Sequence, residues 1–258
     1  MIAANQTTFG SRRSNRVLAT ITVVGMALLL AACILMPGKF TSSLDLRKDG
    51  RFSFAYKGEI HFISPSDLDD KKSDGADKKK DSEAEQMAAM SGALDLSDPK
   101  KAAEFANKLS KQHGWRSVKF MGNGRFDVDY AISGTLTHDF IFPVIDDMPN
   151  SNPFVQVILR EDGSARVRAP GFSAGPGGSP LLSMARLGAM SDSDKDGAKK
   201  KGPQLPTIDG VFTLTTDGTL LANNTEEGPQ ATATGTQLSW TVNERTDHPP
   251  TALVNLKN

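Results

Sequence analysis

The sequence is poor in the residues that most often carry chemistry. It has one cysteine, Cys33, and four histidines among 258 residues, so an internal disulfide is excluded and packing must stabilise the fold. Basic and acidic residues number 30 each, which argues against nucleic-acid binding, since that needs a clustered basic surface. A His-Glu-x-x-His pair and a P-loop are also absent. The composition therefore favours neither a nucleic-acid-binding protein nor the commonest metal or nucleotide enzymes.

The first 33 residues have the pattern of an export signal. An apolar run over 17–32 follows a cluster of arginines, and small residues precede Cys33, which is typical of a secretory signal peptide. The residues Leu30, Ala31, Ala32 and Cys33 resemble the lipobox of bacterial lipoproteins. Two alternatives remain. The segment 17–36 is just long enough to be an uncleaved anchor across a bilayer core of ~30 Å, or the apolar run over 17–32 is a buried core helix.

The lipobox resemblance implies cleavage before Cys33, which would carry covalent diacylglycerol and acyl groups such as palmitate and no other cofactor. It implies attachment to the bacterial cell membrane, facing the periplasm, and Ile34 after the cysteine slightly favours the outer membrane. Cleavage would remove three arginines and no acid, leaving 27 basic and 30 acidic residues and a net charge near −3. We expect a signal peptide over 1–32, a lipidated tether over 33–38 and a single domain over 39–258.

Alternation of apolar and polar residues predicts half-buried strands. The pattern is most regular over 39–63, with Lys48-Asp49-Gly50 as the turn. Further hairpins are predicted over 118–133 around Asn123-Gly124, over 154–169 around Asp162-Gly163 and from 208 around Asp217-Gly218, and the last strands over 237–242 and 252–256. We expect an α+β fold, a twisted antiparallel sheet of about seven to nine strands in a hairpin meander, with helices on one face.

A helix is predicted over 98–113, with Asp98 as N-cap and Pro99 in the first turn. Two insertions, near 64–81 and 171–206, are rich in charged residues and are predicted to be flexible. An amphipathic helix is expected beside each charged tract. Their apolar residues form a candidate contact surface made of Met87, Met90, Met184, Leu187 and Met190. These helices either pack on the core, act as lids, or face a membrane or a partner.

Two site hypotheses remain. Asp192, Asp194 and Asp196 match the start of a calcium loop, but Pro203 stands where a bidentate carboxylate is required, so we expect no metal there. An alternative enzyme hypothesis is a hydrolase that uses Asp127, Asp129 and His138. Our leading prediction assigns no catalytic residue, and these three belong only to the alternative hypothesis.

Three segments carry a family resemblance. They are Pro37-Gly38-Lys39-Phe40 to Gly58, Thr216-Asp217-Gly218 to Asn223-Asn224-Thr225, and Leu238-Ser239-Trp240. They resemble an uncharacterised family of Gram-negative lipoproteins, and the layout is similar to the LppM-like lipoprotein domain. Neither resemblance supplies catalytic residues. We expect a non-enzymatic binding module for an amphiphilic ligand or an envelope protein, without nucleic acid. The alternatives are a hydrolase of envelope material and a purely structural spacer.

Overall fold

The computed structural model describes residues 34–63, 96, 98–146, 148, 151–173, 175 and 206–257. Within them the chain is mostly β. The elements are β1 (Ile34–Leu46), β2 (Arg51–Ile63), α4 (Pro99–Leu109), β3 (Trp115–Gly122), β4 (Arg125–Thr135), β5 (Phe140–Phe142), β6 (Val155–Leu159), β7 (Ser164–Arg168), η1 (Pro170–Phe172), β8 (Asp209–Thr216), β9 (Thr219–Asn223), β10 (Gln230–Thr232), β11 (Gly235–Val242) and β12 (Thr251–Asn255). Helix is a minor component of these residues, so the predicted α+β class describes them only loosely.

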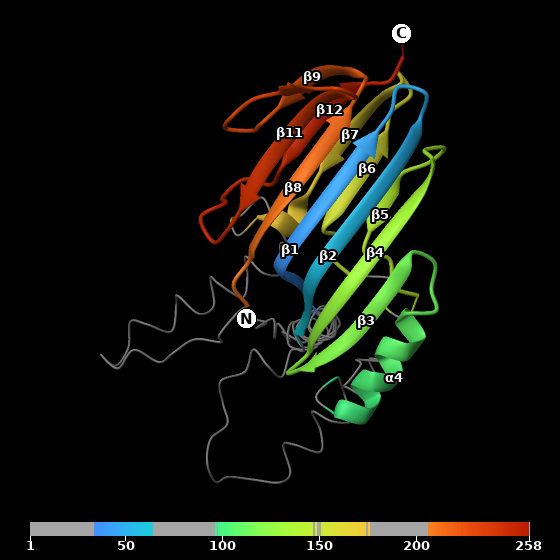
Figure 1. Ribbon diagram of the computed structural model, residues 1–258, viewed down its shortest axis with the longest axis vertical. Helices are drawn as coiled ribbons and strands as arrows, with labels where there is room; N and C mark the ends of the chain where they lie inside the picture. The colour runs from blue at the N-terminus through green and yellow to red at the C-terminus, as the bar shows by residue number, and fades with distance from the viewer. Residues whose placement is uncertain are drawn as a thin grey trace, which may run out of the picture. The chain divides into compact units, whose positions relative to one another are not determined.

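The strands form two sheets, which corrects the prediction of a single antiparallel sheet. Sheet A has seven strands in the order β10-β11-β8-β1-β2-β4-β3, and sheet B has five in the order β5-β6-β7-β12-β9. Sheet A is mixed, because β1 pairs with β2 antiparallel and with β8 parallel (Figure 1). Parallel neighbours require a long crossover, and here the intervening chain supplies strands of sheet B.

Sheet B covers part of the apolar face of sheet A. The even-numbered residues of β2, and those of β1 from Phe40 onward, point inward, where aromatic rings from the two sheets meet. The ring centroids of Phe54 and Phe142 are 5.0 Å apart, and those of Tyr56 and Phe154 are 6.0 Å apart. Phe172 of η1 stacks on Phe40 at 4.2 Å. The apolar face of sheet A is therefore core in this region.

Helix α4 covers another part of the same face. Asp98 caps it by accepting a hydrogen bond from the Lys100 backbone N–H at 2.8 Å. Phe105 packs edge-on against Phe62 and Phe126, with centroid distances of 5.1 and 5.7 Å. The prediction of a covering helix is confirmed, although it ends at Leu109 and the chain over 110–113 turns instead.

Three predicted hairpins are present, and a fourth is wrong. The pairs β1–β2, β3–β4 and β6–β7 form around the expected turns. Asn123 and Gly124 both have positive φ, 51° and 66°, as a type I′ turn requires. At Asp217-Gly218, however, the chain passes from β8 in sheet A to β9 in sheet B, so these strands do not pair. Turn chemistry marks the reversal but does not determine which strand lies beside which.

Three predicted boundaries also differ. Strand β1 begins at Ile34 and Leu35 is fully buried, so 34–38 belongs to the sheet and is not a tether. The second insertion was predicted from 171, but Phe172 is also fully buried, because it fills the space beside Phe40. The stretch 138–153, for which no strand was predicted, contains the short edge strand β5.

Candidate functional site

Most residues that we predicted to be functional lie outside the described part of the chain. This applies to Leu30, Ala31, Ala32 and Cys33, to Met87, Met90, Met184, Leu187 and Met190, and to Asp192, Asp194 and Asp196. Their roles stay predictions. Within the described ranges, no helix is long and apolar enough to cross a membrane.

The first described residues are firmly held. Leu35 has no exposed surface, and Met36 is buried beside it. The Leu35 backbone N–H donates to Asn152 Oδ1 at 3.0 Å, and Asn152 Nδ2 donates back to the Leu35 carbonyl at 2.9 Å. Ile34, which follows Cys33 in the sequence, is thus already part of β1. The next residue, Leu35, is fixed by core packing and two hydrogen bonds.

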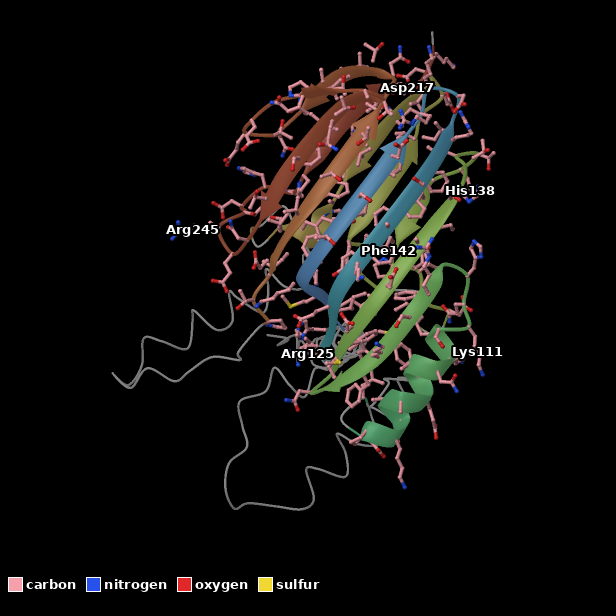
Figure 2. All side chains as sticks on the ribbon, viewed as in Figure 1. Lys111, Arg125, His138, Phe142, Asp217 and Arg245 are labelled. Atoms are coloured by element: carbon pink, nitrogen blue, oxygen red, sulfur yellow. The ribbon has the colours of Figure 1, made fainter. Side chains whose placement is uncertain are left out.

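The β3–β4 turn lies at the same end of sheet A as the start of β1. Ile34 pairs with Ile63, and the Phe62 backbone N–H donates to the Gly124 carbonyl at 2.8 Å. Gly124 has no room for a side chain, because a Cβ there would collide with the Phe62 carbonyl oxygen. Beside this turn, Met121 is 51% exposed. We call this end, with the start of β1 and residues 121–125, the anchor end; Arg125 marks it in Figure 2.

A charged cluster lies on the outer face of sheet A near the anchor end. The Glu59 carboxylate accepts a hydrogen bond from the Lys39 backbone N–H at 3.2 Å. It also lies 3.6 Å from His61 Nε2 and 3.5 Å from a terminal nitrogen of Arg125. Gly38 leaves the space for this cluster, since a Cβ there would be 2.6 Å from His61 Nε2. Glu59 therefore links β1, β2 and β4 across the sheet surface.

His61 is half-buried in this cluster. Burial lowers the pKa of its imidazole below the usual 6.5, and the Glu59 carboxylate opposes that shift in part. We did not single out Glu59 and His61 from the sequence. Glu59 and His61 are two residues apart on the polar face of a predicted strand, and that spacing indicated that they are neighbours. Nothing in the sequence indicated Arg125 beside them, because it belongs to a distant hairpin.

The structure does not bring together the proposed hydrolase residues. Asp127 pairs in register with Glu59 and with Lys119, near the anchor end. His138 follows the other end of β4, after Thr135, and the eight residue-to-residue steps from Asp127 to Thr135 alone span roughly 26 Å. Arg125 and His138 accordingly lie far apart in Figure 2. No metal-binding group of three His, Cys, Asp or Glu occurs in the described ranges.

A Gly-x-Ser-x-Gly string, the spacing of a hydrolase nucleophile elbow, runs from Gly171 to Gly175, and the sequence reasoning missed it. Ser173 is 2% exposed and extended, at φ −134° and ψ 136°, after a short 3₁₀ turn. Its hydroxyl lies 3.1 and 3.0 Å from the carbonyl oxygens of Thr246 and Asp247. An elbow instead exposes its serine on a tight strand-to-helix turn, so Ser173 ties two loops together here.

The outer face of sheet B differs from that of sheet A. Its outward-pointing residues include Ile141, Ile158 and Leu253, with Ile158, Arg166 and Leu253 adjacent across three strands. Arg168 lies in the neighbouring row, between Gln156 and Thr251. The outward-pointing residues of these paired strands include no carboxylate, whereas sheet A mixes both signs. This basic and apolar surface, made of Ile141, Ile158, Arg166, Arg168 and Leu253, is called the sheet B face below.

Comparison with known proteins adds remote structural similarity. No protein-family model and no curated protein matches the sequence. Among solved structures, the NMR structure of the folded domain of LppM from Mycobacterium tuberculosis aligns with a TM-score of 0.31 and 12% sequence identity. The alignment covers 86% of this chain and 92% of that one. A TM-score at this level does not establish a shared fold.

Proposed function

We propose that the protein is a bacterial envelope lipoprotein, anchored through lipid on Cys33, whose described domain is a non-enzymatic binding module for an anionic amphiphile. The observation that carries the anchoring half is the start of β1 at Ile34, one residue after the lipobox cysteine. Export signals precede folded domains, and a lipobox that ends where the sheet begins matches that order. An uncleaved anchor helix over 17–36, one of the competing interpretations, would overlap the first residues of β1.

The sheet B face supports the binding half. Arg166 and Arg168 lie on it without a carboxylate among the outward-pointing residues beside them, and Ile141 is 42% exposed. Guanidinium groups bind phosphate and carboxylate oxygens, and the adjacent isoleucine and leucine side chains offer apolar contact. That combination fits a ligand with an acidic head and an apolar tail.

The anchoring half is tested by the mass of the first residue of the mature protein. Native protein is purified from membranes, and its amino-terminal peptide is compared with that of the Cys33→Ser variant. We expect the peptide to begin at Cys33 with the added mass of diacylglycerol, and the variant to remain unacylated. Because the chain has no other cysteine, thioether-linked lipid has one site. A mature chain that begins upstream of Cys33 without lipid would contradict the proposal.

A further inference from the structure

We propose that the anchor end of sheet A rests on the bilayer and that the β3–β4 turn inserts Met121 among the lipid headgroups. This orientation rests on the proposed lipidation of Cys33. It goes beyond anchoring, because a lipid on a long tether would leave the domain free to tumble, whereas here one end of the sheet becomes a membrane-contact surface.

The connection between the proposed lipid on Cys33 and strand β1 is short. One peptide unit separates Cys33 from Ile34, and one residue spans at most ~3.6 Å. The strand cannot supply further length, because Leu35 is buried and both of its backbone groups are bonded to Asn152. Detaching 34–36 would expose Leu35 and Met36 and break both hydrogen bonds. The start of β1 therefore stays within a few ångströms of the lipid glycerol.

The β3–β4 turn lies close to the start of β1. From β1 the neighbouring strands of sheet A are β2 and then β4, each about 4.8 Å farther. Gly124, bonded to Phe62, therefore lies roughly 10 Å from the β1 strand, within the reach of the same headgroup layer. Figure 1 shows the start of β1 and the ends of β2 and β3 at one end of the sheet.

The anchor end carries side chains suited to contact with lipid. At the anchor end, Met121 is exposed, and Lys119 projects from the same strand. Methionine adapts to irregular apolar surroundings, and a nearby lysine is attracted to an anionic leaflet. Arg125 contributes less, since Glu59 lies 3.5 Å from it. The main proposed contact with the bilayer is thus the apolar side chain of Met121, and attraction of Lys119 to anionic headgroups is secondary.

The opposite end of the sandwich has a different composition. Its turns are three Asp-Gly pairs, at 49–50, 162–163 and 217–218, and none contains an exposed large apolar side chain. The Lys48 backbone N–H donates to Asp217 Oδ1 at 2.7 Å, which joins two of these turns, and Asp217 marks this end in Figure 2. Such turns are solvated readily and gain nothing from contact with lipid.

The orientation is tested with a fluorescent maleimide on acylated full-length protein. The Met121→Cys variant is labelled at one thiol, since Cys33 carries lipid, and is reconstituted in vesicles of phosphatidylethanolamine and phosphatidylglycerol. The matched control is Lys48→Cys, at the opposite end. We expect lipids spin-labelled near the headgroup to quench the probe at 121 several-fold more than the probe at 48, and aqueous iodide to show the reverse order.

The outcomes separate the two proposals. Acylated protein in which both probes are quenched equally, or in which position 48 is quenched more, overturns the orientation and leaves the anchoring intact. Protein that lacks the acyl mass overturns the anchoring, and the orientation with it. Thermal unfolding of both labelled variants is measured first, and we expect wild-type midpoints because Met121 and Lys48 are exposed.

Discussion

Single residues determine how the strands at the anchor end are joined. Glu59 receives the Lys39 N–H and lies within 4 Å of both His61 and Arg125, so one carboxylate contacts three strands. Gly38 and Gly124 leave space for neighbouring groups that any larger residue would displace. Tyr56, fully buried beneath this surface, donates its hydroxyl to the Glu59 carbonyl at 2.7 Å. The end of the sheet nearest Cys33 is therefore fixed by polar contacts as well as by packing.

We expect His61 to make stability depend on pH. Its folded-state pKa lies below 6.5, so the unfolded chain takes up this proton at higher pH than the folded chain does. The His61 contribution is complete above about pH 6.5 and is lost as the pH falls toward the folded-state pKa. The free energy of unfolding, measured by urea denaturation between pH 7.5 and 5 (an interval chosen about the ordinary histidine pKa of roughly 6.5), should fall less steeply in His61→Gln than in wild type.

Two variants control this measurement. His138→Gln removes an imidazole from an exposed turn and so matches the chemical change outside the cluster. Glu59→Gln removes the carboxylate that favours protonated His61, so its loss of stability should extend to lower pH than that of wild type. Identical slopes in wild type and His61→Gln would mean that the buried imidazole is not coupled to folding.

At the scale of elements, sheet A is covered by two different kinds of structure. Sheet B packs over Phe54 and Tyr56, while α4 packs over Phe62 and Phe126. Sheet B and α4 cover adjoining parts of one apolar surface on β2 and β4, since all these residues belong to a single buried core. The helix is therefore part of the domain core at the anchor end.

Phe105 should carry most of the helix contact. Phe105→Ala removes a ring that is 5% exposed and touches both Phe62 and Phe126, so we expect a loss of about 3–5 kcal/mol in the free energy of unfolding. Glu104→Ala, at an exposed neighbouring position, should change it by less than about 0.5 kcal/mol. Equilibrium urea unfolding measures both. Equal effects would show that α4 is not packed on the sheet in solution.

For the whole molecule, the two outer surfaces of the sandwich have unlike charge. Sheet A presents Glu59, Asp127 and Asp129 among basic residues, whereas the sheet B face combines two arginines with apolar side chains. Charge balance suits a solvated surface. An apolar surface whose charged side chains are all basic is more typical of a place where a partner or ligand binds.

We expect the sheet B face to bind a fluorescent anionic lysophospholipid presented below its micelle concentration. The Arg166→Gln/Arg168→Gln double variant should bind about a hundredfold more weakly, since each lost charge-assisted hydrogen bond costs roughly 1.5 kcal/mol, or about tenfold in affinity. The matched control is Lys57→Gln/Lys119→Gln, which removes two cations from sheet A. Fluorescence titration measures both affinities, and equal losses in the two variants would indicate general charge attraction without a site.

Local elements could be predicted from the sequence, but their assembly could not. Period-two alternation over 39–63 identified β1 and β2, and Asn123-Gly124 identified its turn, because both signals are short-range. Alternation shows that one face of a strand is buried but not what buries it. Asp217-Gly218 illustrates this limit, since the same dipeptide chemistry closes a hairpin at Asp162-Gly163 and passes between sheets at 217–218.

The candidate site was predictable only in part. The lipobox is a contiguous string, so Cys33 could be singled out, whereas the sheet B face is assembled from four strands spread over 141–253. Arg166 and Arg168 alternate with Ala165 and Val167, which places both arginines on one side, but only the order β6-β7-β12 brings Ile158 and Leu253 beside them. Pairing across long sequence separations decides such surfaces.

The parallel pairing of β1 with β8 bears on how the chain is made. Lys39 meets Asp209, about 170 positions later, so a polypeptide emerging amino-terminus first presents an unfinished edge until nearly all of it has appeared. Contacts this remote slow folding, and an open edge invites pairing with a second copy. The strand closest to the lipobox thus depends on one of the later strands for its protection from aggregation.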